Sequence, residues 1–267
     1  MLRQGFSNGV KICIFELSIF CVLNDSLVII PTYNEKENAE AIIRKVFALG
    51  FPFDILIVDD NSPDGTQEIV KGLMTEFKDR LHLLARPGKQ GLGTAYIAGF
   101  KWALQHTYAY VFEMDADFSH NPDDLVRLRQ ACVDGADIAI GSRYVTGVNV
   151  VNWPMSRVIL SYFASKYVKI ITGMPINDAT AGFKCYRRKV LETIRFDRIK
   201  FVGYAFQIEM KFKSWYFGFK LAEVPIIFTD RTMGQSKMSK GIVKEAAFGV
   251  IQLKLWSMFR AKRGYHQ

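Results

Sequence analysis

The chain has 267 residues, of which 49% are hydrophobic and 13% aromatic, so it is long enough to bury a full hydrophobic core. Its formal net charge of +9 favours an anionic partner, which could be a nucleic acid, a membrane surface or a phosphorylated substrate. No run approaches the ~18 uninterrupted apolar residues of a membrane span, so we expect no segment that crosses a bilayer.

The N-terminal residues 1–24 are expected to form an extension outside the core. Its apolar stretch, residues 12–23, is interrupted by Glu16 and is followed by no small-residue cleavage site. The cysteines show neither metal-ligand nor disulfide spacing, which favours a reduced, cytoplasmic setting. They are Cys13, Cys21, Cys132 and Cys185.

The first half of the chain alternates short apolar runs with amphipathic segments. The runs are typical of strands buried on both faces, and they occupy residues 27–30, 55–58 and 81–85. Helical spacing of apolar residues follows each run, at 39–47, 69–77 and 95–105. Asn34 is expected to cap the first helix and Gly50 to end it. This alternation predicts an α/β fold with a mostly parallel central sheet flanked by helices.

Polar clusters follow several of these strands. Three of them, residues 31–35, 59–64 and 115–117, stand at equivalent strand ends, whereas a glycine-rich loop at 86–94 leads from the third strand into its helix. Because the carboxyl ends of parallel strands lie at one edge of a sheet, we expect these clusters to form a shared ligand pocket. Within the second cluster, Asp59 is expected to be structural and its neighbour Asp60 to bind.

Asp115 and Asp117 end the apolar run that starts at Tyr110. Alternating carboxylates at a strand end are suited to Mg²⁺ or Mn²⁺, with substrate phosphates completing the shell. The alternative is that Asp115 starts a turn and Asp117 caps the next helix, for which Asn121 is also a candidate cap. His120 is expected to organise the turn, because a hard cation prefers oxygen ligands.

The second half continues the alternation less regularly. Residues 136–140 are predicted to form a strand whose end places Arg143 near the pocket. Residues 150–175 are predicted to form a core helix or an interfacial helix. A polar loop is expected at 178–184, where Asp178 is a base or, as we favour, a loop carboxylate. Helices are expected at 188–194 and 201–217, and an edge strand with Pro225 at 221–228.

The tail, residues 241–267, is basic and amphipathic. From Arg231 to Arg263 there are eight basic residues and one acidic residue. A helix with Trp and Phe beside Lys and Arg suits the headgroup layer of an anionic membrane, but a helix packed on its own domain has the same periodicity. Both interpretations remain open.

Taken together, the motifs resemble a known family. Their ordered set resembles the polyprenol-phosphate (dolichol-phosphate) mannosyltransferases of the inverting glycosyltransferase family 2, over about residues 27–258. The motifs are Pro-Thr-Tyr-Asn-Glu (31–35), Val-Asp-Asp-Asn-Ser-Pro-Asp-Gly (58–65), Gly-Leu-Gly-Thr (91–94), Asp-Ala-Asp-Phe-Ser-His (115–120) and Gly-Ser-Arg-Tyr (141–144).

The resemblance implies a GT-A fold over residues 25–240, a GDP-mannose donor, a divalent metal and a polyprenyl monophosphate acceptor. It assigns the guanosine part of the donor to Pro31, Tyr33, Glu35, Val58 and Asp60. Asp115 and Ala116 would line the donor site, and Asp117 would be the main metal ligand. The phosphates would be held by Arg143, Arg157, Arg231 and Lys237.

Ser119 departs from the family pattern, because some relatives have a metal-ligating glutamine at that position. Since the chain shows no membrane span, it resembles the class that meets lipid on the cytoplasmic face of a membrane, through amphipathic helices or partner subunits.

Three other functions stay open at this point. A polyprenyl-phosphate hexosyltransferase could use a UDP-sugar, and a non-catalytic module could bind nucleotide-sugar or lipid. Nucleic-acid binding is disfavoured, because its phosphates would meet Asp60, Asp115 and Asp117.

Overall fold

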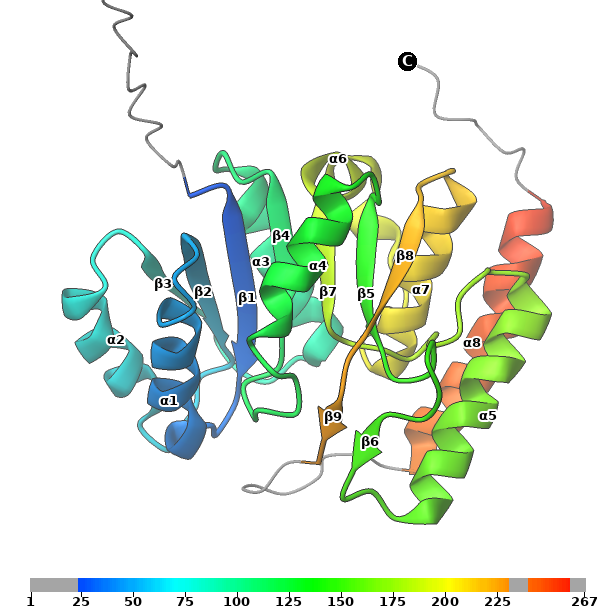
Figure 1. Cartoon of the computed structure of the whole chain (residues 1–267), viewed down its shortest axis with the longest axis horizontal. Coiled ribbons are helices and arrows are strands. Elements are labelled where there is room, and N and C mark those ends of the chain that lie inside the picture. Colours follow the sequence, from blue (N-terminus) through cyan, green and yellow to red (C-terminus); the bar gives the residue numbers. More distant parts are fainter. Residues whose placement is uncertain (1–23, 231–239, 260–267) are drawn as a thin grey trace, which may run out of the picture.

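The structure is a computed structural model that describes residues 24–230 and 240–259. Its centre is a seven-stranded sheet in the order β3-β2-β1-β4-β7-β5-β8 (Figure 1). The strands are β1 (Ser26–Thr32), β2 (Phe53–Asp59), β3 (Leu81–Ala85), β4 (Tyr110–Glu113), β5 (Ile138–Ser142), β7 (Lys184–Arg187) and β8 (Leu221–Pro225). A two-stranded sheet of β6 (Val150–Val151) and β9 (Phe228–Thr229) lies beside it.

Helices cover both faces of the large sheet, as expected. One face is covered by α1 (Lys36–Phe47), α2 (Thr66–Glu76) and α4 (Asp124–Val133). The other is covered by α3 (Leu92–Leu104), α6 (Arg188–Thr193), a short 3₁₀ turn at Phe196–Arg198 and α7 (Tyr204–Tyr216). Two further helices, α5 (Met155–Thr172) and α8 (Lys240–Met258), lie side by side at one end of the molecule (Figure 1).

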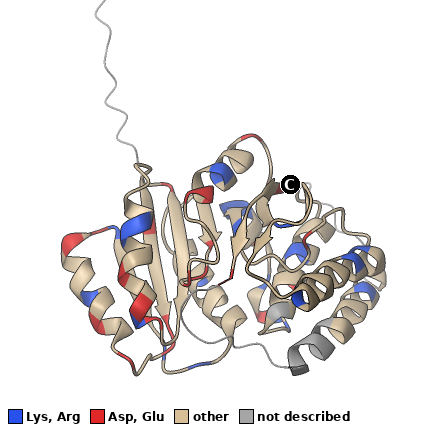
Figure 2. Ribbon diagram, turned by 60° about the horizontal axis from the view of Figure 1, so that its bottom comes forward, with Lys and Arg blue, Asp and Glu red and all other residues tan. Residues whose placement is uncertain are grey.

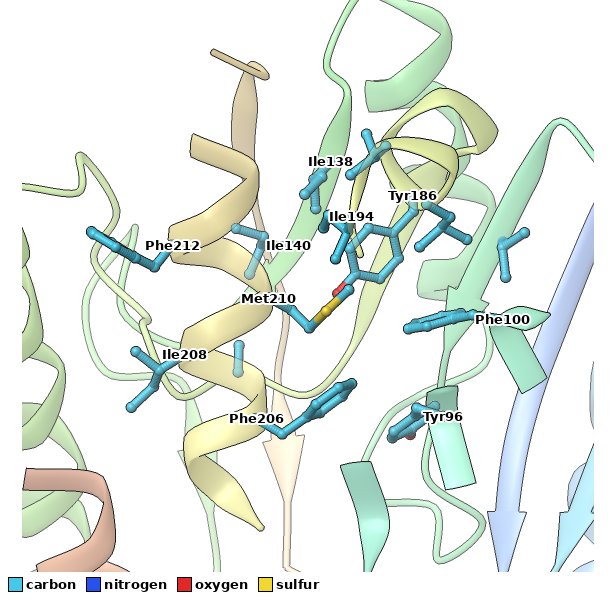
Figure 3. Close-up of a cluster of buried hydrophobic side chains, with 14 of the residues drawn as sticks. Tyr96, Phe100, Ile138, Ile140, Tyr186, Ile194, Phe206, Ile208, Met210 and Phe212 are labelled. Atoms are coloured by element: carbon cyan, nitrogen blue, oxygen red, sulfur yellow. The ribbon is translucent and has the colours of Figure 1, made fainter. Parts of the chain in front are cut away.

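The alternating side chains of β1 show how the core is divided between the two faces. Leu27 and Ile29 pack in the cluster under α3 and α7, whereas Val28 and Ile30 pack in the cluster under α1, α2 and α4. All four are fully buried, which confirms a strand covered on both faces. Figure 3 shows the first cluster, in which aromatic side chains of α3 and α7 meet those of the sheet.

The strand β7 was missed by the sequence analysis, which placed a polar loop at 178–184 and a helix after it. It runs antiparallel to both β4 and β5, so the sheet is mostly parallel with one reversed strand. Two of its four residues, Lys184 and Arg187, are basic, so its sequence lacks the apolar run expected of a central strand. Lys184 is nevertheless fully buried, because it pairs with Glu113 across the strands.

The predicted cap of α1, Asn34, was wrong. Asn34 has a positive φ of 57°, and α1 begins two residues later. Its backbone N–H donates to Ser62 Oγ, and those of Glu35 and Lys36 donate to Thr66 Oγ1 and Asp64 Oδ2. The turn after β2 therefore satisfies the N–H groups that a local cap would satisfy. Asn121 does accept the backbone N–H of Asp123 at its Oδ1, as a cap would, although α4 begins only at Asp124.

Other element boundaries differ less from expectation. α3 begins at Leu92, inside the glycine-rich segment, and the run 221–228 divides into β8 and β9. β8 lies at the edge of the sheet, as Pro225 indicated.

A glycine in α3 tests this packing. A Cβ added at Gly99 would lie 2.7 Å from Ile29 Cγ2, and Ile29 has no room to move in the core. Gly99→Ala is therefore expected to lower the free energy of unfolding by ~1–3 kcal/mol, measured by urea denaturation. Gly72→Ala is the control, because a Cβ there meets nothing within 4 Å. It should instead add up to ~1 kcal/mol through helix propensity.

Candidate functional site

The predicted site residues gather where β1, β2, β4 and β5 end. β1 and β2 run parallel and in register, so Thr32 lies opposite Asp59 and the two polar turns begin side by side. The backbone N–H of Asp60 donates to the Thr32 carbonyl at 3.0 Å, which ties the turns together. Because β7 is antiparallel, its first residue, Lys184, also lies at this edge.

Asp60 lies at one end of this edge, among residues from the glycine-rich loop. Its Oδ1 lies 3.0 Å from Arg86 Nε, and the backbone N–H of Gln90 donates to its Oδ2 at 3.4 Å. Burial raises the pKa of the Asp60 carboxyl, against the opposing charge of Arg86. Lys89 Nζ lies 4.8 Å from the centroid of the Tyr33 ring.

Arg86 and Lys89 were not among the predicted site residues. The available signal was their position, since the loop 86–94 follows β3 at the same edge of the sheet as Tyr33 and Asp60.

The neighbouring Asp59 has the structural role expected of it. Its carboxylate accepts hydrogen bonds from Thr32 Oγ1 at 2.7 Å, Ser62 Oγ at 2.6 Å and Gln67 Nε2 at 2.7 Å. These contacts join the ends of β1 and β2 and engage both oxygens of the carboxylate.

Asp115 and Asp117 lie in a tight loop directly after β4. Tyr96 OH donates to Asp115 Oδ1 at 3.2 Å, and the Asp115 side chain is 36% exposed. Asp117 is more buried, and its Oδ1 accepts from the backbone N–H of Ser119 at 3.1 Å. Phe118, which lies between Asp117 and Ser119, has a positive φ of 59°. The expected alternative, in which Asp117 caps the next helix, is wrong, because α4 begins only at Asp124.

The donor set of this loop fits a divalent metal that shares its shell with substrate. Across the described residues, no group of three or more His, Cys, Asp or Glu side chains is arranged to hold a metal ion. The loop does supply two carboxylates and the hydroxyl of Ser119, which are hard oxygen donors. Mg²⁺ is commonly bound by one or two carboxylates and completed by substrate phosphates, so these residues suit such a site.

Arg143 follows β5 and is held by the buried carboxylate of Asp178. Its Nε and Nη2 donate to Asp178 at 2.7 and 2.6 Å, and its backbone N–H donates at 3.0 Å. Burial opposes ionisation of Asp178, but the Arg143 charge and hydrogen bonds outweigh it and lower the pKa of this carboxyl. Asp178 is therefore an orienting loop carboxylate rather than a base.

Arg157 is the other predicted phosphate ligand that the structure describes. Its Nη1 lies 2.9 Å from Asp230 Oδ1, and its guanidinium lies 4.0 Å from the centroid of the Trp153 ring. Trp153 also lies 5.4 Å from the Arg143 guanidinium, so one indole contacts both arginines. The remaining two predicted phosphate ligands, Arg231 and Lys237, lie outside the described residues, as do residues 1–23 with Cys13 and Cys21.

A buried polar network lies directly before the loop that carries Asp115 and Asp117. The Glu113 carboxylate accepts from Tyr186 OH and Gln207 Nε2, each at 2.8 Å, and lies 2.9 Å from Lys184 Nζ. Burial lowers the pKa of Lys184, and Glu113 opposes this shift. The described cysteines take no part, because Cys132 and Cys185 are buried free thiols.

The sequence of the chain is similar to those of known glycosyltransferases. Residues 27–195 match the model of a family described as glycosyl transferase family 2. The chain is 46% identical over 239 residues to a polyprenol monophosphomannose synthase of Mycolicibacterium smegmatis, with 90% of each chain covered. It is 44% identical to an undecaprenyl-phosphate mannosyltransferase of Micrococcus luteus, with 89% of this chain and 98% of that one covered.

Solved structures with low sequence identity share the fold. A mannosyltransferase of Pyrobaculum calidifontis, in complex with GDP-Man and Mn²⁺, has a TM-score of 0.55 at 16% identity, covering 88% of this chain and 74% of that chain. A glucosyl-3-phosphoglycerate synthase of Mycobacterium tuberculosis has a TM-score of 0.63 at 13% identity, covering 87% and 80%. The α/β fold is thus of the GT-A type that was expected.

The pair of Arg143 and Asp178 gives a pH-dependent prediction. Asp178→Asn leaves the buried guanidinium without its counter-charge, so the free energy of unfolding at pH 7 should fall by ~3–5 kcal/mol. Since the folded pKa of Asp178 lies below the unfolded value of ~3.9, its contribution is present above pH ~4. It is lost as the pH falls through the folded pKa.

Urea denaturation from pH 7 to 3 checks this. The difference in stability between the wild type and Asp178→Asn should be constant down to pH ~4 and should begin to narrow below it. Asp197→Asn is the control, because Asp197 pairs with Arg195 on the surface, where both side chains are 62% exposed. It should cause little change at any pH. A constant gap between wild type and Asp178→Asn down to pH 3 would contradict the assignment.

Proposed function

The chain belongs to glycosyl transferase family 2 and is a glycosyltransferase, and we propose that it transfers mannose from GDP-mannose to a polyprenyl monophosphate with inversion. One observation carries this proposal: paired carboxylates and an arginine lie together at the strand ends of a chain that is 46% identical to a polyprenol monophosphomannose synthase. Two curated relatives are named for mannosyl transfer onto prenyl phosphates, which supports both the sugar and the acceptor class.

The chemistry needs little proton transfer. A polyprenyl monophosphate is already anionic at pH 7, so one of its oxygens can attack the anomeric carbon directly. The new bond joins that oxygen to C1 of mannose, while the bond from C1 to the GDP oxygen breaks and GDP leaves with the electron pair. Attack opposite the leaving group converts an α-linked donor into a β-linked mannosyl phospholipid. Positioning and charge neutralisation therefore dominate.

The charges of the site suit these two tasks. Asp115 and Asp117 would hold Mg²⁺ or Mn²⁺, which supplies charge neutralisation at the departing diphosphate. Asp117 is the main ligand in this proposal, and Ser119, where some relatives have glutamine, would contribute a weaker oxygen contact. Ala116, between the carboxylates, is 3% exposed and would line the donor site.

The donor nucleoside would lie at the other end of the strand edge. Pro31 lies near the end of β1, and Tyr33 and Glu35 follow that strand. Val58 lies near the end of β2, and Asp60 follows it. The carboxylate of Asp60 is held by Arg86 in a position to accept from a base, and the Tyr33 ring offers a stacking surface.

The phosphates would be held by arginine and lysine. Arg143 is fixed by two hydrogen bonds to Asp178, so its orientation is set before substrate arrives. Arg157 would serve the acceptor phosphate in competition with its ion pair to Asp230. Arg231 and Lys237 complete the proposed set.

A donor panel tests the proposal. Purified full-length chain is incubated with polyprenyl phosphate, Mn²⁺ and either GDP-mannose, UDP-glucose or other nucleotide-sugars, and the glycolipid product is measured. Transfer from GDP-mannose alone is expected, and Asp117→Asn should reduce it by at least ~100-fold with an unchanged melting temperature. Turnover of UDP-glucose but not GDP-mannose would overturn the donor assignment, and no transfer from any donor would leave a non-catalytic binding module.

A lipid acceptor implies contact with a membrane surface, and we propose that α5 and α8 provide it. No helix among the described residues is long and apolar enough to span a bilayer. One face of α8 packs inward through Val250 and Leu253, which are 2% and 4% exposed. Both helices also expose large apolar side chains, namely Met155, Ile159, Leu160, Phe163, Ile170, Phe248, Ile251, Leu255 and Met258.

Charge on these helices fits an anionic surface. α5 carries Arg157, Lys166 and Lys169 and no acidic residue. In Figure 2 the acidic positions lie mainly on the helices at the left and around the strand ends, whereas the helices at the right carry Lys and Arg. Exposed apolar side chains beside basic ones favour insertion into the headgroup layer. In this proposal, α8 is both a helix packed on its own domain and an interfacial helix, since one of its faces packs inward and another is exposed.

Vesicle binding tests this surface. Phe163 lies on α5 and is 64% exposed. Phe163→Glu should weaken binding to phosphatidylglycerol vesicles by roughly tenfold or more, because it replaces an apolar ring with a negative charge that the anionic lipid repels. Val126→Glu is the matched control, since Val126 is 39% exposed on α4, away from α5 and α8. Equal binding of wild type and Phe163→Glu in a sedimentation assay would refute this orientation.

A further inference from the structure

His120 closes the loop that carries the two carboxylates. The backbone N–H of Asp115 donates to His120 Nδ1 at 3.2 Å, so the first and last residues of the segment 115–120 are joined by one hydrogen bond. The imidazole is almost fully buried, with the residue only 2% exposed. The loop between these ends contains Asp117, whose side chain would otherwise have several accessible directions.

The imidazole ring is held in a fixed plane. It stacks on Phe183 with centroids 4.8 Å apart and an interplanar angle of 17°, and it meets the edge of Phe228 at 5.4 Å. The backbone of Gly182 also runs beside it, since a Cβ there would lie 3.6 Å from the ring Cε1. These neighbours come from the segment before β7 and from β9, so the ring connects two distant segments of the chain to the loop.

The hydrogen bond defines the tautomer of the ring. Nδ1 accepts, so it carries no proton, and the proton of the neutral imidazole is on Nε2.

The loop needs such a restraint. Phe118 has a φ of 59°, a left-handed conformation that is unfavourable for a residue with a bulky side chain. Its ring gives little compensating burial, because the residue is 37% exposed. A conformation of this kind persists only when surrounding contacts determine it.

We propose that His120 is a positioning residue for sugar transfer, which fixes the Asp115–Ser119 loop through the hydrogen bond at Nδ1 and thereby aims both carboxylates at the metal and diphosphate. His120 does not touch substrate or metal in this role. The inference rests on the proposed function only in taking Asp115 and Asp117 as the site of a divalent metal with a nucleoside diphosphate. Residues that orient ligands in this way typically change metal affinity or activity by 10–100-fold when replaced.

Three variants of the full chain separate the hydrogen bond from the packing. His120→Phe keeps an aromatic ring against Phe183 and removes the acceptor. His120→Asn places an amide oxygen close to the position of Nδ1, whereas His120→Gln places it one bond further away. The last two variants bury the same polar group, so they differ chiefly in where the acceptor lies.

Calorimetric binding of Mn²⁺ together with GDP is the first readout, and kinetics is the second. His120→Phe and His120→Gln should bind at least ~10-fold more weakly and lose kcat similarly, while KM for the lipid acceptor stays within about twofold. His120→Asn should restore affinity to within about threefold of wild type. Melting temperatures measured in parallel identify any variant that fails to fold, and the comparison of Asn with Gln then decides alone.

Equal binding by His120→Asn and His120→Gln would overturn the proposal, as would wild-type affinity in His120→Phe. Losses that follow the melting temperature in every variant would do so too, because they would show a packing role only. The same titrations are run with UDP. If the wild type binds Mn²⁺ with UDP but not with GDP, the proposed donor is wrong, and the order of the three variants with UDP still tests the role of His120.

Discussion

The buried ion pair between Glu113 and Lys184 is the interaction on which the centre of this structure depends. The two residues are cross-strand neighbours on β4 and β7, and both side chains are fully buried. Burying two charges has a large desolvation cost, which good geometry and additional hydrogen bonds must offset. Here Gln207 contacts both partners and Tyr186 donates to Glu113, so the carboxylate has three donors. The pair ends β4 one residue before Met114, and thus fixes where the loop with Asp115 begins.

The reversed direction of β7 makes this pairing possible. A parallel strand would bring its last residue to the ligand edge, but an antiparallel strand brings its first residue, Lys184, together with the segment 178–183 that precedes it. That segment supplies Asp178 to Arg143 and Phe183 to His120. Lys211 holds it from α7 by donating to the Ala181 carbonyl at 2.6 Å. One reversed strand therefore connects the carboxylate loop to the arginine that follows β5.

The sequence predicted the parts of this structure that depend on local pattern. Continuous apolar runs identified β1 and β2, because a strand buried on both faces has no polar alternation, and the strand-end rule then placed Asp60, Asp115 and Arg143 at one edge. It failed where a distant partner decides the local structure. From the sequence alone, Lys184 is typical of a loop, and only its ion pair with Glu113 explains its place in a strand. Asn34 is typical of a helix cap, but side chains of the turn after β2 accept the backbone N–H groups at the start of α1; they are Ser62, Asp64 and Thr66. Arg86 was missed for the same reason, since its partner Asp60 is 26 positions earlier in the sequence.

The proposed reaction requires two phosphate-containing substrates to bind close together without occupying the same groups. The carboxylates of Asp115 and Asp117 repel phosphate unless a cation neutralises them, so the diphosphate end of the donor can bind there only with a metal. The arginines need no metal, and both Arg143 and Arg157 contact the ring of Trp153, which precedes α5 by two residues. Since α5 is also the helix with exposed apolar side chains, an acceptor phosphate at Arg157 would leave its hydrocarbon chain beside that surface. In the proposed reaction, the carboxylates would thus face the donor, the arginines the reacting phosphate, and the apolar helix the lipid.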